Sequence, residues 1–321
     1  MQLSQIQSMA QTIAGNVNKV IVGKEDVIDK LLIAMIASGH VLLEDVPGTG
    51  KTLLAKAMAK SINGSFKRIQ FTPDLLPSDL SGINYYNQKH SEFEFRPGPL
   101  FTNILLADEI NRATPRTQSS LLECMEERQV SIDGETKELG RPFLVIATQN
   151  PVENQGTFPL PEAQLDRFLF KVKMGYPTTE QGLDILKRFK SSNPLEDIAS
   201  VAEAADIAAA QRSYSQVAVS DELMLYLLRI VEKTRTHGDV ATGVSPRGSQ
   251  ALLKAAQVHA LLRGRDFVIP DDVKRMAGPV LAHRIIVRGA FRSRHDAAEA
   301  IVASILQEVA VPTESDLVNQ E

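Results

Sequence analysis

The stretch LLEDVPGTGKT, from Leu42 to Thr52, decides the fold class of this chain. Its close, GKT, is typical of a phosphate-binding loop, in which glycine amides surround phosphate oxygens beside a lysine and a metal-binding hydroxyl. Asp45 stands where such a loop usually has its first glycine, and an Asx side chain tolerates the unusual backbone of that turn. We therefore predict a working nucleotide loop, with a purely structural strand-to-helix turn as the alternative.

The loop supplies each chemical group that phosphate binding needs. Gly48 and Gly50 permit a tight backbone, Lys51 provides the cation, and Thr52 provides a hydroxyl for the metal ion. The predicted cofactors are ATP and Mg²⁺. The predicted nucleotide contacts in the loop are Pro47, Gly48, Thr49, Gly50, Lys51, Thr52 and Leu53.

Short apolar runs alternate with helical segments through the first half of the chain. The runs at 40–44, 66–71, 103–108, 143–148 and 168–174 indicate buried strands, with helices at 52–62 and 115–128 among them. This alternation predicts a parallel sheet covered on both faces. Beyond about Pro177 the pattern is helical, with helices predicted over 183–190, 220–235, 246–262 and 270–282 and no convincing strand.

Polar residues follow two of the predicted strands. Asp108 and Glu109 end the run NILLAD, where a parallel sheet places them beside the loop. Asp108 is the predicted second metal ligand, and Glu109 the group that polarises the attacking water. Asn150 ends the next strand, where its amide can orient that water. The simpler alternatives are a strand that meets solvent and a turn-forming Asn before Pro151.

Composition narrows the class of protein. The 321 residues are 43% hydrophobic and 23% charged, as in ordinary folded domains, and the net charge of -4 gives no general attraction to nucleic acid or an anionic membrane. The single cysteine, Cys124, excludes an intrachain disulfide and is expected to be a small buried hydrophobe. The start lacks a signal-like pattern and the longest apolar run, Leu31 to Ala37, is short, so we expect a cytoplasmic protein without membrane insertion.

From about Val22 to Arg288, the chain resembles the MoxR family of AAA+ ATPases. The similarity rests on LLEDVPGTGKT, LLADEINRATPRTQSSLLECMEERQV, IATQNPVENQGTFPLPEAQLDRFL and GVSPRGSQALL. It implies an α/β fold, an AAA+ P-loop core with a five-stranded parallel sheet and flanking helices, followed by a smaller all-α lid domain. The expected boundaries are a core at 1–176 with inserts near 82–98 and 129–139, a lid at 177–310, and a tail at 311–321.

The resemblance also assigns roles that spacing alone does not. Asn150 matches the sensor beyond the acidic pair, Arg167 the arginine finger offered to a neighbouring subunit, and Arg247 the lid sensor of the γ-phosphate. Val22 and Gly23 match the segment that packs against adenine.

Simpler interpretations of Arg167 and Arg247, without a role in ATP hydrolysis, stay open. Arg167 beside Asp166 could form a local ion pair, and Arg247 could simply begin a helix. Other arginines could also approach a subunit interface, namely Arg112, Arg116 and Arg128.

The family resemblance implies a homo-oligomer, a hexameric ring, that remodels, matures or activates a partner protein with a von Willebrand A domain or a metalloenzyme complex. The alternative is a DNA-engaged motor related to helicases. The second insert carries Asp133, Glu135 and Glu138 against Lys137 alone, and acidic tips repel a phosphate backbone, so we favour a protein partner over nucleic acid. A non-catalytic, nucleotide-dependent scaffold is the third interpretation, and the acidic pair with the loop lysine argues against it.

Overall fold

A five-stranded parallel sheet forms the centre of the first half of the chain. The computed structural model describes residues 1–44, 48–150, 156–190, 193–289 and 294–312. The elements of this half are α1 (Leu3–Asn18), α2 (Glu25–Ile36), β1 (Val41–Glu44), α3 (Lys51–Ser61), β2 (Phe66–Gln70), α4 (Pro77–Ser81), β3 (Gly82–Asn87), β4 (Glu92–Pro97), β5 (Ile104–Asp108), η1 (Ile110–Arg112), α5 (Pro115–Glu127), β6 (Gln129–Ile132), β7 (Glu135–Glu138), β8 (Leu144–Gln149), α6 (Glu162–Leu165) and β9 (Phe170–Val172).

The order of the strands in this sheet is β2-β5-β8-β1-β9, and every neighbouring pair is parallel. Val41 of β1 lies opposite Ile146 on one side and Phe170 on the other. The predicted five-stranded parallel sheet is confirmed. Its three central strands are apolar and buried up to the polar residues at their carboxyl ends, because helices cover both faces.

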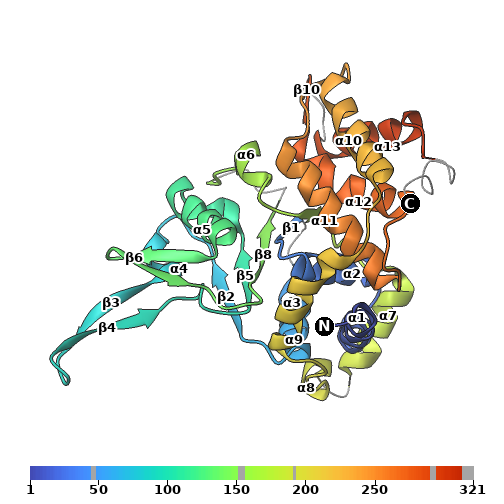
Figure 1. The fold of residues 1–321 in the computed structure, drawn as a ribbon. Helices are drawn as coiled ribbons and strands as arrows, with labels where there is room; N and C mark the ends of the chain where they lie inside the picture. The colour runs from blue at the N-terminus through green and yellow to red at the C-terminus, as the bar shows by residue number, and fades with distance from the viewer. Residues whose placement is uncertain (45–47, 151–155, 191–192, 290–293, 313–321) are drawn as a thin grey trace.

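The two faces of the sheet belong to two separate apolar clusters. Successive side chains on a strand point to opposite faces, so Val41 and Leu43 join one cluster while Leu42 joins the other. The first cluster contains side chains of α1, α2 and α3, and the second contains side chains of α5. Figure 1 shows these helices on the two sides of the sheet.

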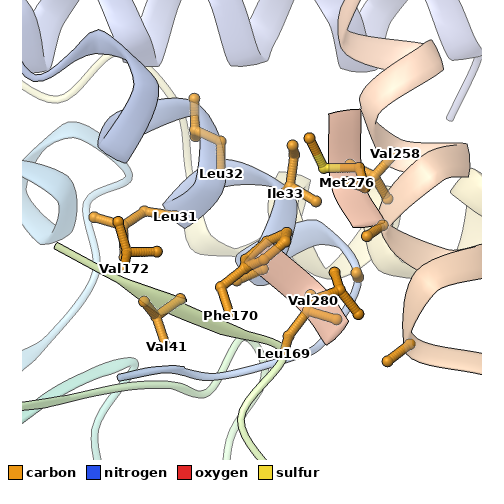
Figure 2. Packing of buried hydrophobic residues seen from close by; sticks show 14 of the residues in the cluster. Leu31, Leu32, Ile33, Val41, Leu169, Phe170, Val172, Val258, Met276 and Val280 are labelled. Carbon is orange, nitrogen blue, oxygen red and sulfur yellow. The ribbon is translucent and has the colours of Figure 1, made fainter. Parts of the chain in front are cut away.

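Helices dominate the second half of the chain, as predicted. Its elements are α7 (Thr179–Phe189), α8 (Pro194–Asp197), α9 (Ala204–Ser213), η2 (Tyr214–Gln216), α10 (Asp221–Thr236), β10 (Val240–Thr242), α11 (Pro246–Leu262), α12 (Pro270–Leu281), η3 (Ala282–Arg284), β11 (Ile286–Val287) and α13 (Arg294–Glu308). The lid shares the first apolar cluster with the core. Figure 2 shows Ile33 and Phe170 from the core gathered with Met276 and Val280 from α12.

The lid differs from the expected all-helical domain in one detail. Strands β10 and β11 form a short antiparallel pair, with Val240 opposite Val287. Such short segments carry no periodic pattern, and they meet only because the intervening helices fold back. The sequence also predicts neither α9 nor α13, and for α9 the reason is that its many alanines give a weak apolar stripe.

Each of the two inserts forms an antiparallel hairpin. Strands β3 and β4 pair from Gly82 to Pro97, and Figure 1 shows this hairpin projecting away from the sheet. Strands β6 and β7 turn at Asp133 and Gly134, whose φ angles of 51° and 85° suit a two-residue hairpin turn. Asn84 Nδ2 donates a hydrogen bond to Asp133 Oδ2 at 2.8 Å, so the hairpins contact each other.

Cys124 lies inside α5 and is 5% exposed. Burial raises the pKa of its thiol to about 12, which agrees with the expected small hydrophobe rather than a reactive thiolate. Among the helices within the described ranges, none combines the length and apolar character needed to cross a membrane.

Candidate active site

The loop between β1 and α3 presents backbone amides at the start of a helix. Gly48 and Gly50 have φ angles of 85° and 93°, which only glycine adopts at low cost, and Gly50 is the N-cap of α3. Lys51 and Thr52 form the first turn of that helix, where the aligned peptide dipoles favour an anion. Pro47, another predicted contact, lies outside the described residues.

A cavity of about 430 Å³ opens beside this loop at the carboxyl end of the sheet. This volume falls within the usual range for a small-molecule site. The lining residues are Gly48, Gly50, Lys51, Thr52, Leu53, Arg68, Gln70, Asp108, Glu109, Thr148 and Asn150. Eight residues predicted from the sequence therefore meet in one cavity, and Thr49 lies between two of them in the chain.

Both oxygens of the Asp108 carboxylate are hydrogen-bonded. Thr148 Oγ1 donates to Oδ1 at 2.6 Å. The Arg68 guanidinium donates to Oδ2 through Nη2 at 2.6 Å and through Nε at 3.2 Å. These contacts fix the direction in which the carboxylate faces the cavity.

Glu109 adopts a left-handed backbone conformation, with φ 56° and ψ 51°. A non-glycine residue in this region costs about 1–3 kcal/mol, and surrounding contacts must hold it. Its N–H donates to Thr148 Oγ1 at 2.8 Å, while Oε2 accepts from Gln70 Nε2 at 2.7 Å and lies 2.8 Å from Arg112 Nε. The turn therefore directs this carboxylate into the cavity.

The donor set of the cavity fits a nucleotide with its magnesium ion. Mg²⁺ prefers oxygen ligands, and Thr52, which has a hydroxyl, and Asp108, which has a carboxylate, line the same cavity. Lys51 and the start of α3 supply positive potential for phosphates. Glu109 and Asn150 are the lining residues suited to binding a water molecule beside the phosphates. Asn150 directly follows β8 and is 8% exposed.

Arg167 and Arg247 line a second cavity, of about 230 Å³, rather than the first. Both contact Glu126 of α5: Arg167 Nε lies 3.3 Å from Oε2, and Arg247 Nη2 pairs with Oε1. The structure thus brings the two predicted arginines together at a shared carboxylate, apart from the phosphate-binding loop.

Arg284 of η3 joins the lid to the segment that carries Arg167. Its Nε donates to Asp166 Oδ1 at 2.6 Å, and its Nη2 donates to the carbonyl oxygen of Phe168 at 2.7 Å. Ser245 Oγ donates to the other Asp166 oxygen at 3.1 Å. Burial lowers the pKa of Arg284, and the nearby Asp166 carboxylate opposes that shift. Asp166 therefore pairs with the lid, rather than with Arg167 as the local alternative held.

Val22 and Gly23 lie where the core meets α7 rather than among the described lining residues of the first cavity. Gly23 has a φ of 65°, and a Cβ there would come within 2.1 Å of Gln181 Nε2. The adjacent Lys24 Nζ donates to the carbonyl oxygen of Met174 at 2.6 Å. The assignment of Val22 and Gly23 to the adenine remains a prediction.

Several residues of both cavities are not predicted by the sequence. Arg68 and Gln70 are polar residues at alternate positions of the short strand FKRIQF, so they point to the same face. The sequence does not show that this face borders the cavity, because that depends on the pairing of β2 with β5. Glu126 and Arg284 gave no signal, because charged residues in helices and at their ends are common. The missed residues are Arg68, Gln70, Glu126, Thr148, Asp166 and Arg284.

The fold and the first cavity define a class, the P-loop ATPases with a helical lid. A family model described as the ATPase family associated with various cellular activities matches residues 40–170, and an AAA lid domain model matches residues 232–305. The chain is therefore an ATPase, in agreement with the loop and the acidic pair.

Individual relatives narrow this class. The chain is 54% identical over 303 residues to YeaC of Bacillus subtilis, covering 94% of this chain and 95% of YeaC. It is 42% identical over 305 residues to the chaperone MoxR1 of Mycobacterium tuberculosis, covering 92% of this chain and 80% of the relative. The crystal structure of a Cytophaga hutchinsonii protein aligns with a TM-score of 0.90 and 38% identity over 97% of both chains. The chain belongs to the MoxR family of AAA+ ATPases.

Proposed function

We propose that this ATPase binds Mg²⁺ and ATP in the cavity beside the loop and uses hydrolysis to remodel a partner protein. The observation that carries the proposal is the convergence of Lys51, Thr52, Asp108, Glu109 and Asn150 on one cavity. One relative is named a chaperone, which supports remodelling as the output of hydrolysis.

Each residue has a separate task in this proposal. Lys51 binds the outer phosphates, and Thr52 and Asp108 hold Mg²⁺, which when bound neutralises charge on the phosphates. Glu109 polarises the attacking water, and Asn150 orients it. Gln70 and Arg112 hold the Glu109 carboxylate before nucleotide arrives.

Assembly into a ring of identical subunits, with six as the expected number, forms part of the proposal. Arg167 would then complete the neighbouring subunit's site, while Arg247 would report the state of the γ-phosphate to the lid. Both guanidinium groups contact Glu126 in the single chain, at the junction of core and lid. This position supports a role in communication between nucleotide, lid and neighbouring subunit.

The two hairpins are the proposed contact surfaces for the partner. Phe93 is 74% exposed and Tyr86 is 52% exposed on the projecting β3–β4 hairpin, and exposed aromatic side chains are typical of protein interfaces. The second hairpin is acidic, and its Lys137 pairs with Glu135 at 3.0 Å. These features favour a protein partner over DNA, and we propose a von Willebrand A domain protein or a metalloenzyme complex.

Replacing Glu109 with Gln tests the proposal. ATP binding should persist because the phosphate and metal contacts remain, whereas turnover should fall at least about 100-fold with loss of the catalytic base. Equilibrium binding of a fluorescent ATP analogue and steady-state phosphate release measure the two effects. Glu123→Gln is the matched control, since Glu123 is exposed on α5 outside the cavity.

Hydrolysis at the parental rate in Glu109→Gln would contradict the assignment of this carboxylate. The same variant should dwell in its ATP-bound form, so affinity purification with ATP should retain the partner. Recovery of a von Willebrand A domain protein supports the proposed partner. Steeply salt-dependent DNA binding by the ATP-bound variant, with no protein retained, contradicts it.

A further inference from the structure

Two polar side chains of β2 reach into the candidate active site from the neighbouring strand. Arg68 and Gln70 are two residues apart, so they leave the strand on the same face. Strand β2 is at the edge of the sheet and pairs with β5. In this pair, Gln70 of β2 lies opposite Asp108 of β5. Both side chains line the cavity that also contains Lys51.

The Arg68 guanidinium is hydrogen-bonded to the Asp108 carboxylate, which the proposed function assigns to Mg²⁺ binding. Two of its nitrogens lie 2.6 and 3.2 Å from Asp108 Oδ2, and Thr148 takes the other oxygen. A guanidinium is permanently charged and binds a carboxylate through several N–H groups at once. A metal ion that uses Asp108, directly or through water, must therefore compete with Arg68.

Arg68 also connects the two acidic residues of the site. Its Nη2 donates to Gln70 Oε1 at 3.1 Å, and Gln70 Nε2 donates to Glu109 Oε2 at 2.7 Å. Hydrogen bonds in such a chain polarise one another. Arg68 is therefore held at the site by both Asp108 and Gln70.

We propose that Arg68 is a positioning residue that occupies Asp108 until the metal–nucleotide complex arrives and leaves this carboxylate when the metal binds. The inference rests on the proposed function, because it takes Asp108 as the metal-binding carboxylate. The Arg68 side chain is 48% exposed, which leaves it room to move away, whereas the Asp108 side chain is 17% exposed and stays at the site. Metal arrival and departure of Arg68 from Asp108 are thereby coupled.

Metal affinity tests this inference without measuring hydrolysis. Mn²⁺ is titrated into protein carrying one equivalent of ADP, and free Mn²⁺ is followed by electron paramagnetic resonance. Arg68→Gln removes the competitor and should tighten Mn²⁺ binding about tenfold, as expected for loss of one charge-assisted hydrogen-bonded pair. Arg68→Lys keeps the charge but loses the fork of donors, so its affinity should fall between those of the other two proteins.

Lys67→Gln is the matched control. Lys67 is exposed on the same strand and points to the opposite face, so this variant removes one positive charge without touching Asp108. Its Mn²⁺ affinity should equal that of the parent. Equal tightening in both Gln variants would show a general charge effect and overturn the inference, as would unchanged affinity in Arg68→Gln.

Asp108→Asn separates this inference from the proposed function. If Mn²⁺ binding survives Asp108→Asn unchanged, the metal lies elsewhere, and the proposed metal site itself fails. If Asp108→Asn weakens binding while Arg68→Gln leaves it unaltered, the metal site stands and only the role of Arg68 is wrong. A circular dichroism spectrum of each variant shows whether the fold is retained before affinities are compared.

Discussion

At the scale of single residues, burial and two hydrogen bonds set the pKa and the tautomer of His40. It lies between β1, α5 and β8, and its Nδ1 accepts from Val145 N–H at 3.0 Å while Nε2 donates to the Met125 carbonyl oxygen at 2.9 Å. These contacts require the neutral ring with its proton on Nε2. Burial lowers the pKa of His40 to about 4, with a smaller opposing contribution from the Met125 hydrogen bond.

Stability should therefore depend on pH through His40. The unfolded chain takes up a proton near pH 6.5 and the folded chain only near pH 4, so this contribution is complete above pH 6.5 and is lost as the pH falls toward 4. Between pH 7.5 and 5.0 the loss from this group should be about 2 kcal/mol. Urea unfolding at both pH values measures it.

His40→Gln serves as the comparison, because Gln supplies a donor and an acceptor but does not titrate. We expect this variant to be less stable than the parent at pH 7.5 and to lose less stability on acidification. An identical pH dependence in the two proteins would mean that His40 is not the responsible group.

At the scale of elements, the attachment of the lid depends on η3 and the segment 166–169. Arg284 is 3% exposed at its side chain and donates to Asp166 and to several carbonyl oxygens across the boundary. Removing one member of a buried ion pair leaves the other charge unpaired, which is more costly than losing the attraction alone. The contact between lid and core is therefore polar as well as apolar.

Arg284→Met should destabilise the protein by about 3–5 kcal/mol, because Asp166 would be left without its guanidinium. Arg263→Met is the control, since the Arg263 side chain is 46% exposed in its pair with Asp29 and such pairs contribute about 1 kcal/mol or less. Chemical denaturation compares the two. Losses of similar size would contradict a special role for the buried arginine.

At the scale of the whole molecule, the proposed ring, in which neighbouring subunits share active sites, can be tested by mixing two inactive variants. If Arg167 is the proposed arginine finger, it acts on the neighbouring site, so Arg167→Ala and Glu109→Gln would damage opposite sides of one interface. Each variant alone should be nearly inactive. Mixed in equal amounts, they should recover about a quarter of the parental rate, because that share of interfaces in a random heterologous ring is intact.

Phosphate release after mixing and reassembly measures this recovery. Mixing Glu109→Gln with Lys51→Ala is the control, since both changes damage the same side of the interface and no pairing restores it. If Arg167→Ala and Glu109→Gln also fail to complement in assembled rings, Arg167 does not act across a subunit boundary, and Arg112, Arg116 or Arg128 becomes the next arginine to test.

Sequence alone predicted the strands of the sheet, most of the longer helices and most lining residues of the first cavity, because the relevant signals are local. Apolar runs indicated β1, β5 and β8, and the glycines around Lys51 defined the turn that follows β1. Parallel strands end at one edge of their sheet, so the positions of Asp108 and Asn150 at strand ends were enough to predict that both lie near the loop. Helices α10, α11 and α12 of the lid followed from their periodicity and caps.

Only the tertiary structure decided which distant polar groups are partners. Arg68 and Asp108 are 40 residues apart, and they meet because packing places β2 next to β5. Glu126 receives Arg167 and Arg247, and Asp166 receives Arg284, through the docking of the lid on the core. The residues next to each partner in the sequence do not predict these pairings, because the pairings arise from how whole elements bury their apolar faces against one another.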